Sequence, residues 1–133
     1  MYTFTPETLS GLNKFRFSSS RSLTLQANIY TIDKTSYEIK QENDEPIDSL
    51  DELREELPDN SPRYVIISYL MTTSDGRMKL PYVLVYWIPH TSGQNLRMLY
   101  AGATELFRSK AGVSQLITIE EEDQFDDFEE MLN

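Results

Sequence analysis

The stretch Arg63-Tyr64-Val65-Ile66-Ile67-Ser68-Tyr69-Leu70-Met71-Thr72 decides the fold, because it is apolar on both of its alternating sets of side chains. A strand over residues 63–72 must therefore be covered on both faces. A second stretch of the same kind runs over residues 78–88, with Pro81 typical of a bulge. Asp75-Gly76 between the two predicts a hairpin turn, because glycine accepts the positive φ that such turns require. Two strands of this kind predict helices on both faces of one sheet.

The flanking sequence predicts those helices and the remaining strands from caps, breakers and hydrophobic period. Before the central pair of strands we expect a short helix from Thr5-Pro6 to about Asn13, a half-buried strand from Ser22 to Tyr30, a turn over 33–36, a strand over 37–41, and a helix that begins with the capping box Ser49–Glu52 and ends at Pro58. After the pair we expect a long helix over 94–110 stopped by Gly112 and a strand over 115–119. A last helix, capped by Asp123, carries Phe125, Phe128 and Leu132. This order predicts a three-layer α+β fold around a mixed sheet, in a single domain over residues 1–133.

Charge is distributed unevenly along the chain, although the net charge is −10. Residues 38–59 contain ten acidic and two basic residues, and residues 120–133 contain eight acidic residues and no base. The remainder contains four acidic and ten basic residues and is therefore positive. Such a charge distribution steers partners toward particular surfaces. The bases are too few and too scattered to indicate nucleic acid as a partner.

Several classes of function are disfavoured by residues that the sequence lacks. There is no cysteine, which excludes disulfides, thiol catalysis and zinc–thiolate sites. No nucleophile elbow or phosphate loop is present, and the only histidine, His90, lies in a predicted loop with no expected chemical role. The N-terminus has no secretory pattern, and the longest apolar run, residues 82–89, is too short to span a membrane. We therefore expect a soluble intracellular protein that is not an enzyme and needs no metal or cofactor.

Tyr86-Trp87-Ile88-Pro89, followed by Met98-Leu99-Tyr100-Ala101, resembles the passage from strand to long helix in the actin-depolymerising-factor homology (ADF-H, or cofilin) family. Further segments resemble the glia maturation factor branch of that family, and the similarity extends from about Leu9 to Leu132. These segments are Lys14-Phe15-Arg16-Phe17 after the first helix, Glu55-Glu56-Leu57-Pro58 running on to Pro62-Arg63-Tyr64, Asp75-Gly76-Arg77, and Tyr100-Ala101-Gly102. The resemblance implies the cofilin-like fold, with a central sheet of five or six strands.

The resemblance also implies a function. Members of this branch bind the actin-related protein 2/3 complex, inhibit its nucleation of actin, promote debranching of filament networks, and bind actin monomers or filaments weakly or not at all. We accordingly expect a monomeric binding protein in the cytoplasm at cortical actin structures, with the nucleus as a further location, and no membrane or nucleic-acid partner. Two alternatives remain. One is a cofilin-like protein that binds and severs filaments, and the other is a small enzyme, which would require a well-formed polar pocket.

The long helix is the first candidate site. One stripe, which includes Tyr100 and Phe107, has the spacing of core residues. On the stripe roughly opposite, Met98 offers an adaptable apolar side chain and Arg97 a directional guanidinium. The resemblance implies that this stripe docks between two subdomains of an actin-like protein, with the N-terminal segment beside it. The candidate residues are Lys14, Arg16, Arg97, Met98, Ala101, Thr104, Glu105 and Arg108.

The hairpin is the second candidate site. Its residues Asp75, Gly76, Arg77 and Lys79 have the composition of an ordinary turn. The resemblance implies that this hairpin faces the first actin subunit of the daughter filament. The last helix differs from that of cofilins, whose basic residues help to grip filaments, because here it is acidic. That difference favours the glia maturation factor branch.

Overall fold

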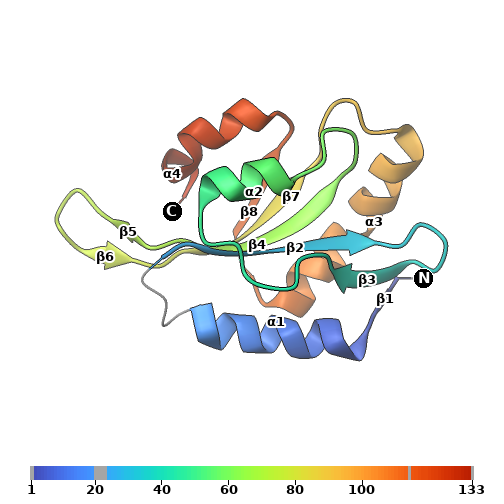
Figure 1. Cartoon of the computed structure of the whole chain (residues 1–133), viewed down its shortest axis with the longest axis horizontal. Coiled ribbons are helices and arrows are strands. Elements are labelled where there is room, and N and C mark those ends of the chain that lie inside the picture. Colours follow the sequence, from blue (N-terminus) through green and yellow to red (C-terminus); the bar gives the residue numbers. More distant parts are fainter. Residues whose placement is uncertain (1, 20–23, 114, 133) are drawn as a thin grey trace.

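The computed structural model describes residues 2–19, 24–113 and 115–132 and confirms a three-layer α+β fold (Figure 1). Its central sheet has six strands in the order β1-β3-β2-β4-β7-β8; β1–β3 and β7–β8 pair in parallel, and the other neighbours pair antiparallel. The strands of this sheet are β1 Thr3–Phe4, β2 Gln26–Ile32, β3 Glu38–Gln41, β4 Arg63–Ser68, β7 Tyr82–Trp87 and β8 Gln115–Ile119. The helices are α1 Pro6–Ser19, α2 Leu50–Glu56, α3 Gln94–Ala111, the 3-10 helix η1 Glu122–Asp127 and α4 Phe128–Met131.

The two central strands are buried on both faces, as predicted from their sequences. Tyr64 and Ile66 of β4 pack into the core under α1 and α3, whereas Val65 and Ile67 pack into the core under α2, η1 and α4. Strand β7 alternates in the same way. In Figure 1 the sheet lies between α1 and the pair formed by α2 and α4. The sheet therefore separates two hydrophobic cores.

The predicted hairpin is interrupted near its base. Strands over 63–72 and 78–88 were expected to be continuous. Instead, each is divided into two: β4 and β7 pair within the central sheet, and β5 Met71–Thr72 and β6 Met78–Lys79 form a separate two-stranded ribbon. Pro81 has no N–H to donate, and its carbonyl accepts the N–H of Tyr69 at 3.0 Å. The ribbon projects beyond the body of the molecule (Figure 1).

The first helix and first long strand differ from their predictions. Helix α1 continues to Ser19 instead of ending near Asn13, because Leu12 and Phe15 recur at i, i+3 and are both buried. Strand β2 is covered on both faces, so the half-buried pattern was wrong; its buried Asn28 accepts a hydrogen bond from Asn43 at 3.0 Å. The predicted start of this strand, at residues 22–23, lies outside the described residues.

The C-terminal prediction also needs correction. The last helical segment begins as 3-10 helix, and its capping box is formed by Glu121 and Gln124 instead of Asp123. Phe125 and Phe128 are buried as expected. Strand β1 was not predicted, because its two residues are too few to show a period.

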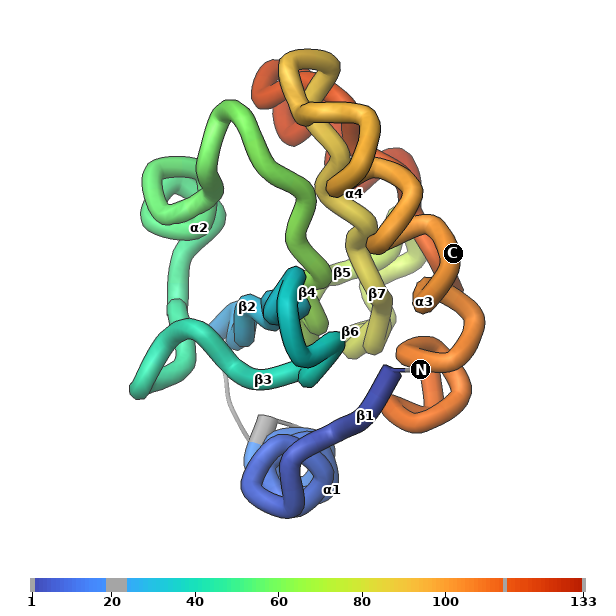
Figure 2. The backbone as a smooth tube through the Cα atoms, turned by 90° about the vertical axis from the view of Figure 1, so that its right-hand side faces the viewer, coloured from blue at the N-terminus to red at the C-terminus, as the bar shows by residue number. Residues whose placement is uncertain are grey.

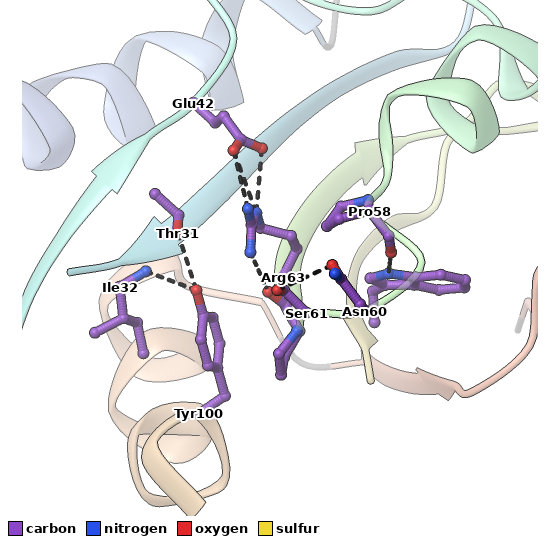
Figure 3. A network of polar contacts seen from close by, with 10 residues as sticks. Thr31, Ile32, Glu42, Pro58, Asn60, Ser61, Arg63 and Tyr100 are labelled. Carbon is purple, nitrogen blue, oxygen red and sulfur yellow. Dashed lines mark hydrogen bonds and ion pairs between the residues drawn. The ribbon is translucent and has the colours of Figure 1, made fainter. Parts of the chain in front are cut away.

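Helix α3 is held firmly against the sheet. Gly112 ends it in the left-handed conformation (φ 69°), as predicted. The Tyr100 hydroxyl accepts the backbone N–H of Ile32 at 2.9 Å and lies 2.9 Å from the Thr31 hydroxyl (Figure 3). The Tyr64 hydroxyl donates to the carbonyl of Tyr100. These bonds fix the end of β2 and the start of β4 to the middle of α3. Across the described ranges, each helix is too short or too polar to cross a membrane.

Candidate partner-binding surface

The outer face of α3 exposes an apolar side chain where the sequence predicted one. Met98 is 65% exposed, although it is large and hydrophobic. Ala101, one turn further along, is also exposed and is too small to shield it. An exposed methionine beside a small residue can adapt to an apolar cleft on another protein.

Arg97 is only partly exposed and also makes a structural contact. Its side chain is half-buried, and Nη1 donates to the carbonyl of Pro89 at 3.2 Å. Burial raises the pKa of the neighbouring Tyr86 hydroxyl to about 12, and the positive charge of Arg97 acts in the opposite direction. Arg97 therefore stabilises the loop that leads into α3, and its substitution would disturb that loop as well as the surface. Substitution of Met98 tests the binding surface alone.

Thr104 does not belong to the exposed face, and its assignment to a binding surface was wrong. It is 8% exposed, and its hydroxyl donates to the Tyr100 carbonyl at 2.9 Å and lies 3.3 Å from the Tyr64 hydroxyl. Thr104 follows Tyr100 by four residues and precedes Phe107 by three, so helical periodicity alone places it on the core side.

The remaining predicted residues lie on the C-terminal half of α3 and on α1. Arg108 is half-buried and pairs with Glu105 at 2.8 Å. The Arg16 guanidinium lies 5.7 Å from the centre of the Tyr82 ring and against the end of α3, so close that a Cβ on Gly112 would lie 2.4 Å from its Nη1. Lys14 is exposed on α1. The structure therefore brings α1 beside α3, with Arg16 at the C-terminal end of α3.

A groove of about 590 Å³ adjoins Met98 at the N-terminal half of α3. Tyr2 forms part of it and is anchored by a hydrogen bond from its hydroxyl to the Leu99 carbonyl at 2.8 Å. This groove was not predicted, because its walls come from three distant segments with no shared sequence pattern. The residues that line it are Tyr2, Lys34, Tyr37, Asn95, Leu96, Met98 and Leu99.

The hairpin tip forms a second, separate surface. Gly76 has φ 88°, and the Asp75 carboxylate accepts a hydrogen bond from the Thr73 hydroxyl. This bond, followed by one from the Arg77 N–H, lowers the pKa of Asp75. The Arg77 side chain is 85% exposed, with Nε 3.5 Å from Asp75 Oδ2, and Lys79 is exposed. The hairpin and the N-terminal end of the chain lie at opposite ends of the molecule (Figure 1).

The sheet also separates the charges of the helices. Helices α1 and α3 on one face carry five bases and two acids. Helices α2, η1 and α4 on the other face carry ten acids and one base. That base, Arg54, bonds to Glu122 at 2.6 Å and Asp126 at 2.9 Å, and these bonds raise its pKa. The candidate surface on α3 therefore lies on the positive face.

Within the described residues, no group of three or more His, Cys, Asp or Glu side chains could hold a metal ion. His90 is exposed, as expected, with Nε2 3.4 Å from Glu121 Oε1 and Nδ1 4.0 Å from Glu120 Oε2.

Comparison with known proteins shows similarity over the full chain. Residues 1–133 match the family described as cofilin/tropomyosin-type actin-binding protein. Protein AIM7 of Saccharomyces cerevisiae is 41% identical over 126 residues, which cover 90% of this chain and 85% of the relative. Glia maturation factor of Drosophila melanogaster is 34% identical over 120 residues, covering 89% and 84%.

Solved structures agree with these matches. The solution structure of glia maturation factor from Caenorhabditis elegans superimposes with a TM-score of 0.77 at 34% identity, covering 93% of this chain and 88% of the other. The crystal structure of Streptomyces griseoflavus cofilin superimposes with a TM-score of 0.73 at 19% identity, covering 96% of each chain, and supports the fold alone.

Proposed function

We propose that this chain, which belongs to the cofilin/tropomyosin-type family of actin-binding proteins, acts on branched actin networks by binding the actin-related protein 2/3 complex. It would thereby inhibit actin nucleation by that complex and promote debranching, as a binding protein and not as an enzyme. Family membership supports an action on actin assemblies, and similarity to glia maturation factors supports the choice within that family. This activity would place the protein in the cytoplasm at cortical actin structures, and also in the nucleus where such networks occur.

The exposure of Met98 is the observation that carries the proposal. A side chain of this size that is 65% exposed on a firmly anchored helix offers an apolar anchor for a partner. Helices α1 and α3, on the same face of the sheet, carry five bases against two acids, and this positive face favours an acidic partner surface. An actin-related subunit with an apolar cleft and an acidic rim meets both requirements.

The proposed mechanism uses both surfaces. Helix α3 occupies the cleft of an actin-related subunit that would otherwise receive the first actin of a daughter filament, so nucleation is inhibited. The hairpin, at the far end of the molecule, approaches that actin and weakens its junction with the complex. The length of the molecule between the two surfaces allows one domain to act on both partners (Figure 1).

Binding of the purified complex to Met98→Ala tests the proposal. Loss of a central apolar anchor costs about 2 kcal/mol, which weakens the affinity roughly 30-fold. Met78→Ala is the matched control, because Met78 has the same 65% exposure but lies on the β6 strand of the hairpin. Circular dichroism checks that both variants are folded. Wild-type protein that does not bind the complex, or equal affinities of the two variants, would contradict the proposal.

The alternative is a cofilin-like protein that binds and severs filaments, which the family description as actin-binding favours. Ten acidic side chains on α2, η1 and α4 argue against a grip on filaments by this face. Co-sedimentation of the wild-type protein with pure filaments separates the two functions, because strong pelleting would support the alternative.

A further inference from the structure

We infer that Lys34 and Tyr37, beside α3, form a second part of the partner-binding surface and that the groove between them and Met98 receives an apolar side chain flanked by a carboxylate. This inference rests on the proposed function, because the ligand would be the same acidic, actin-related partner. It adds a contact from the β2–β3 connection, far in sequence from α3.

Tyr37 has an unfavourable backbone conformation. Its φ of 62° is the only positive φ of a non-glycine residue within the described ranges. For an aromatic residue this conformation is uncommon and costs free energy, whereas glycine or asparagine adopts it readily. Strain of this kind, held in place by its surroundings, is concentrated at functional sites.

The surroundings of Tyr37 hold it in this conformation. Its N–H donates to the Asp33 carbonyl at 2.8 Å, and its own carbonyl accepts the N–H of Thr3 at 3.0 Å. The Asp33 carboxylate accepts the N–H groups of Thr35 at 2.8 Å and Ser36 at 3.0 Å. None of these bonds uses the Tyr37 side chain. These bonds therefore hold the backbone at this position independently of the aromatic ring.

The aromatic ring instead forms a wall of the groove. Tyr37 is 39% exposed, and its ring stacks on that of Tyr2 with centroids 5.6 Å apart and an angle of 24°. Tyr2 is in turn bonded to the Leu99 carbonyl of α3. Figure 2 shows the N-terminal segment beside α3. The exposed side chain of Met98 also lines this groove, so it continues the proposed α3 surface.

The groove is preformed, because the turn and the helix are fixed to each other. The Tyr100 hydroxyl bonds to Thr31 and Ile32, the two residues that precede Asp33 (Figure 3). A partner therefore need not order the turn when it binds, which reduces the entropic cost of association.

The charge at the rim determines the chemistry of the partner. Lys34 lines the groove and is exposed. The adjacent Asp33 carboxylate is already occupied by the two turn N–H groups and lies 4.0 Å from Lys40. A carboxylate on the partner is therefore the complement of Lys34, and an apolar side chain next to it would fill the space between Tyr37 and Met98.

Two variants test the inference against the purified actin-related protein 2/3 complex. Tyr37→Gly relieves the backbone strain but also removes the ring that stacks on Tyr2, so we expect a thermal midpoint near that of the wild type and an affinity lowered about tenfold. Lys34→Glu reverses the rim charge without altering the turn bonds and should weaken binding by a similar factor, with the loss reduced at high salt. Lys40→Glu is the matched control, because Lys40 makes the same charge change outside the groove, and we expect its affinity to match that of the wild type.

The outcomes separate this inference from the proposed function. If the wild type does not bind the complex, the proposed function fails. If the wild type binds and Met98→Ala weakens binding, but Tyr37→Gly and Lys34→Glu bind as the wild type does, only the inference is overturned. If Tyr37→Gly is unfolded at the assay temperature, Lys34→Glu against Lys40→Glu decides the question, and equal affinities overturn the inference.

Discussion

Replacement of Tyr100 by phenylalanine should loosen α3 from the sheet by an amount that the structure defines. The substitution keeps the buried ring but removes the hydroxyl that accepts the N–H of Ile32 and bonds to Thr31, both at 2.9 Å. Ile32 is 4% exposed, so its N–H is left buried without this acceptor. A buried donor without an acceptor costs about 1–3 kcal/mol, and we expect a loss of ~2 kcal/mol in the free energy of unfolding. The Thr31 hydroxyl is half-buried and can bond to water, so it adds little.

Tyr86→Phe is the control for this experiment. The Tyr86 hydroxyl is buried and has no hydrogen-bond partner among the described residues, so its removal should change the stability by less than ~0.5 kcal/mol or increase it. Urea unfolding followed by circular dichroism measures both variants. Tyr100→Phe should lower the midpoint without changing the slope, and its melting temperature should fall by about 8 °C. Equal losses in the two variants would refute the view that the Tyr100 hydroxyl holds α3 to β2.

Three further predictions follow from other features. Arg77→Ala with Lys79→Ala should leave affinity for the free complex near the wild-type value but slow the loss of branches in a microscope assay; parallel loss of both activities would mean a single continuous surface. Asp123→Lys, Asp127→Lys and Glu130→Lys together should increase co-sedimentation with filaments in a salt-sensitive manner, since these acids, unlike Glu122 and Asp126, do not hold Arg54. Gly112→Ala should cost about 1 kcal/mol in thermal unfolding because φ is 69°, and a neutral effect would contradict the left-handed helix end.

Much of the architecture was predictable where one strong signal determined an element. Residues 64–67 are apolar on both alternating faces, so burial on both sides of β4 followed directly. The strand over 115–119 and the end of α3 at Gly112 also match their predictions. Predictions failed where tertiary contacts overrode local sequence. Helix α1 extends past Asn13 because Phe15 is buried in the core. Asn28 is buried in β2 because the Asn43 side chain donates a hydrogen bond to it.

The site was predictable only in part, for a related reason. Exposure of Met98 and of the hairpin bases follows from helical period and turn composition. Contacts between distant segments leave no local pattern, so the stacking of Tyr2 on Tyr37 was not foreseen. The positive φ of Tyr37 was not predicted either, because tyrosine rarely adopts a positive φ and nothing in the sequence indicates one here. Thr104 was misplaced even though its spacing from Tyr100 indicated burial.

The separation of charge by the sheet has a consequence for the kinetics of association. A molecule with acids on one face and bases on the other has a dipole moment across the sheet, and in the field of a negatively charged protein it rotates before contact. The positive face, with α1 and α3, would then lead, so a larger share of collisions is productive. The association rate should decrease as salt is added, while the dissociation rate, which depends on the apolar anchor, should change little. Stopped-flow measurements over a range of ionic strength would resolve the two rates.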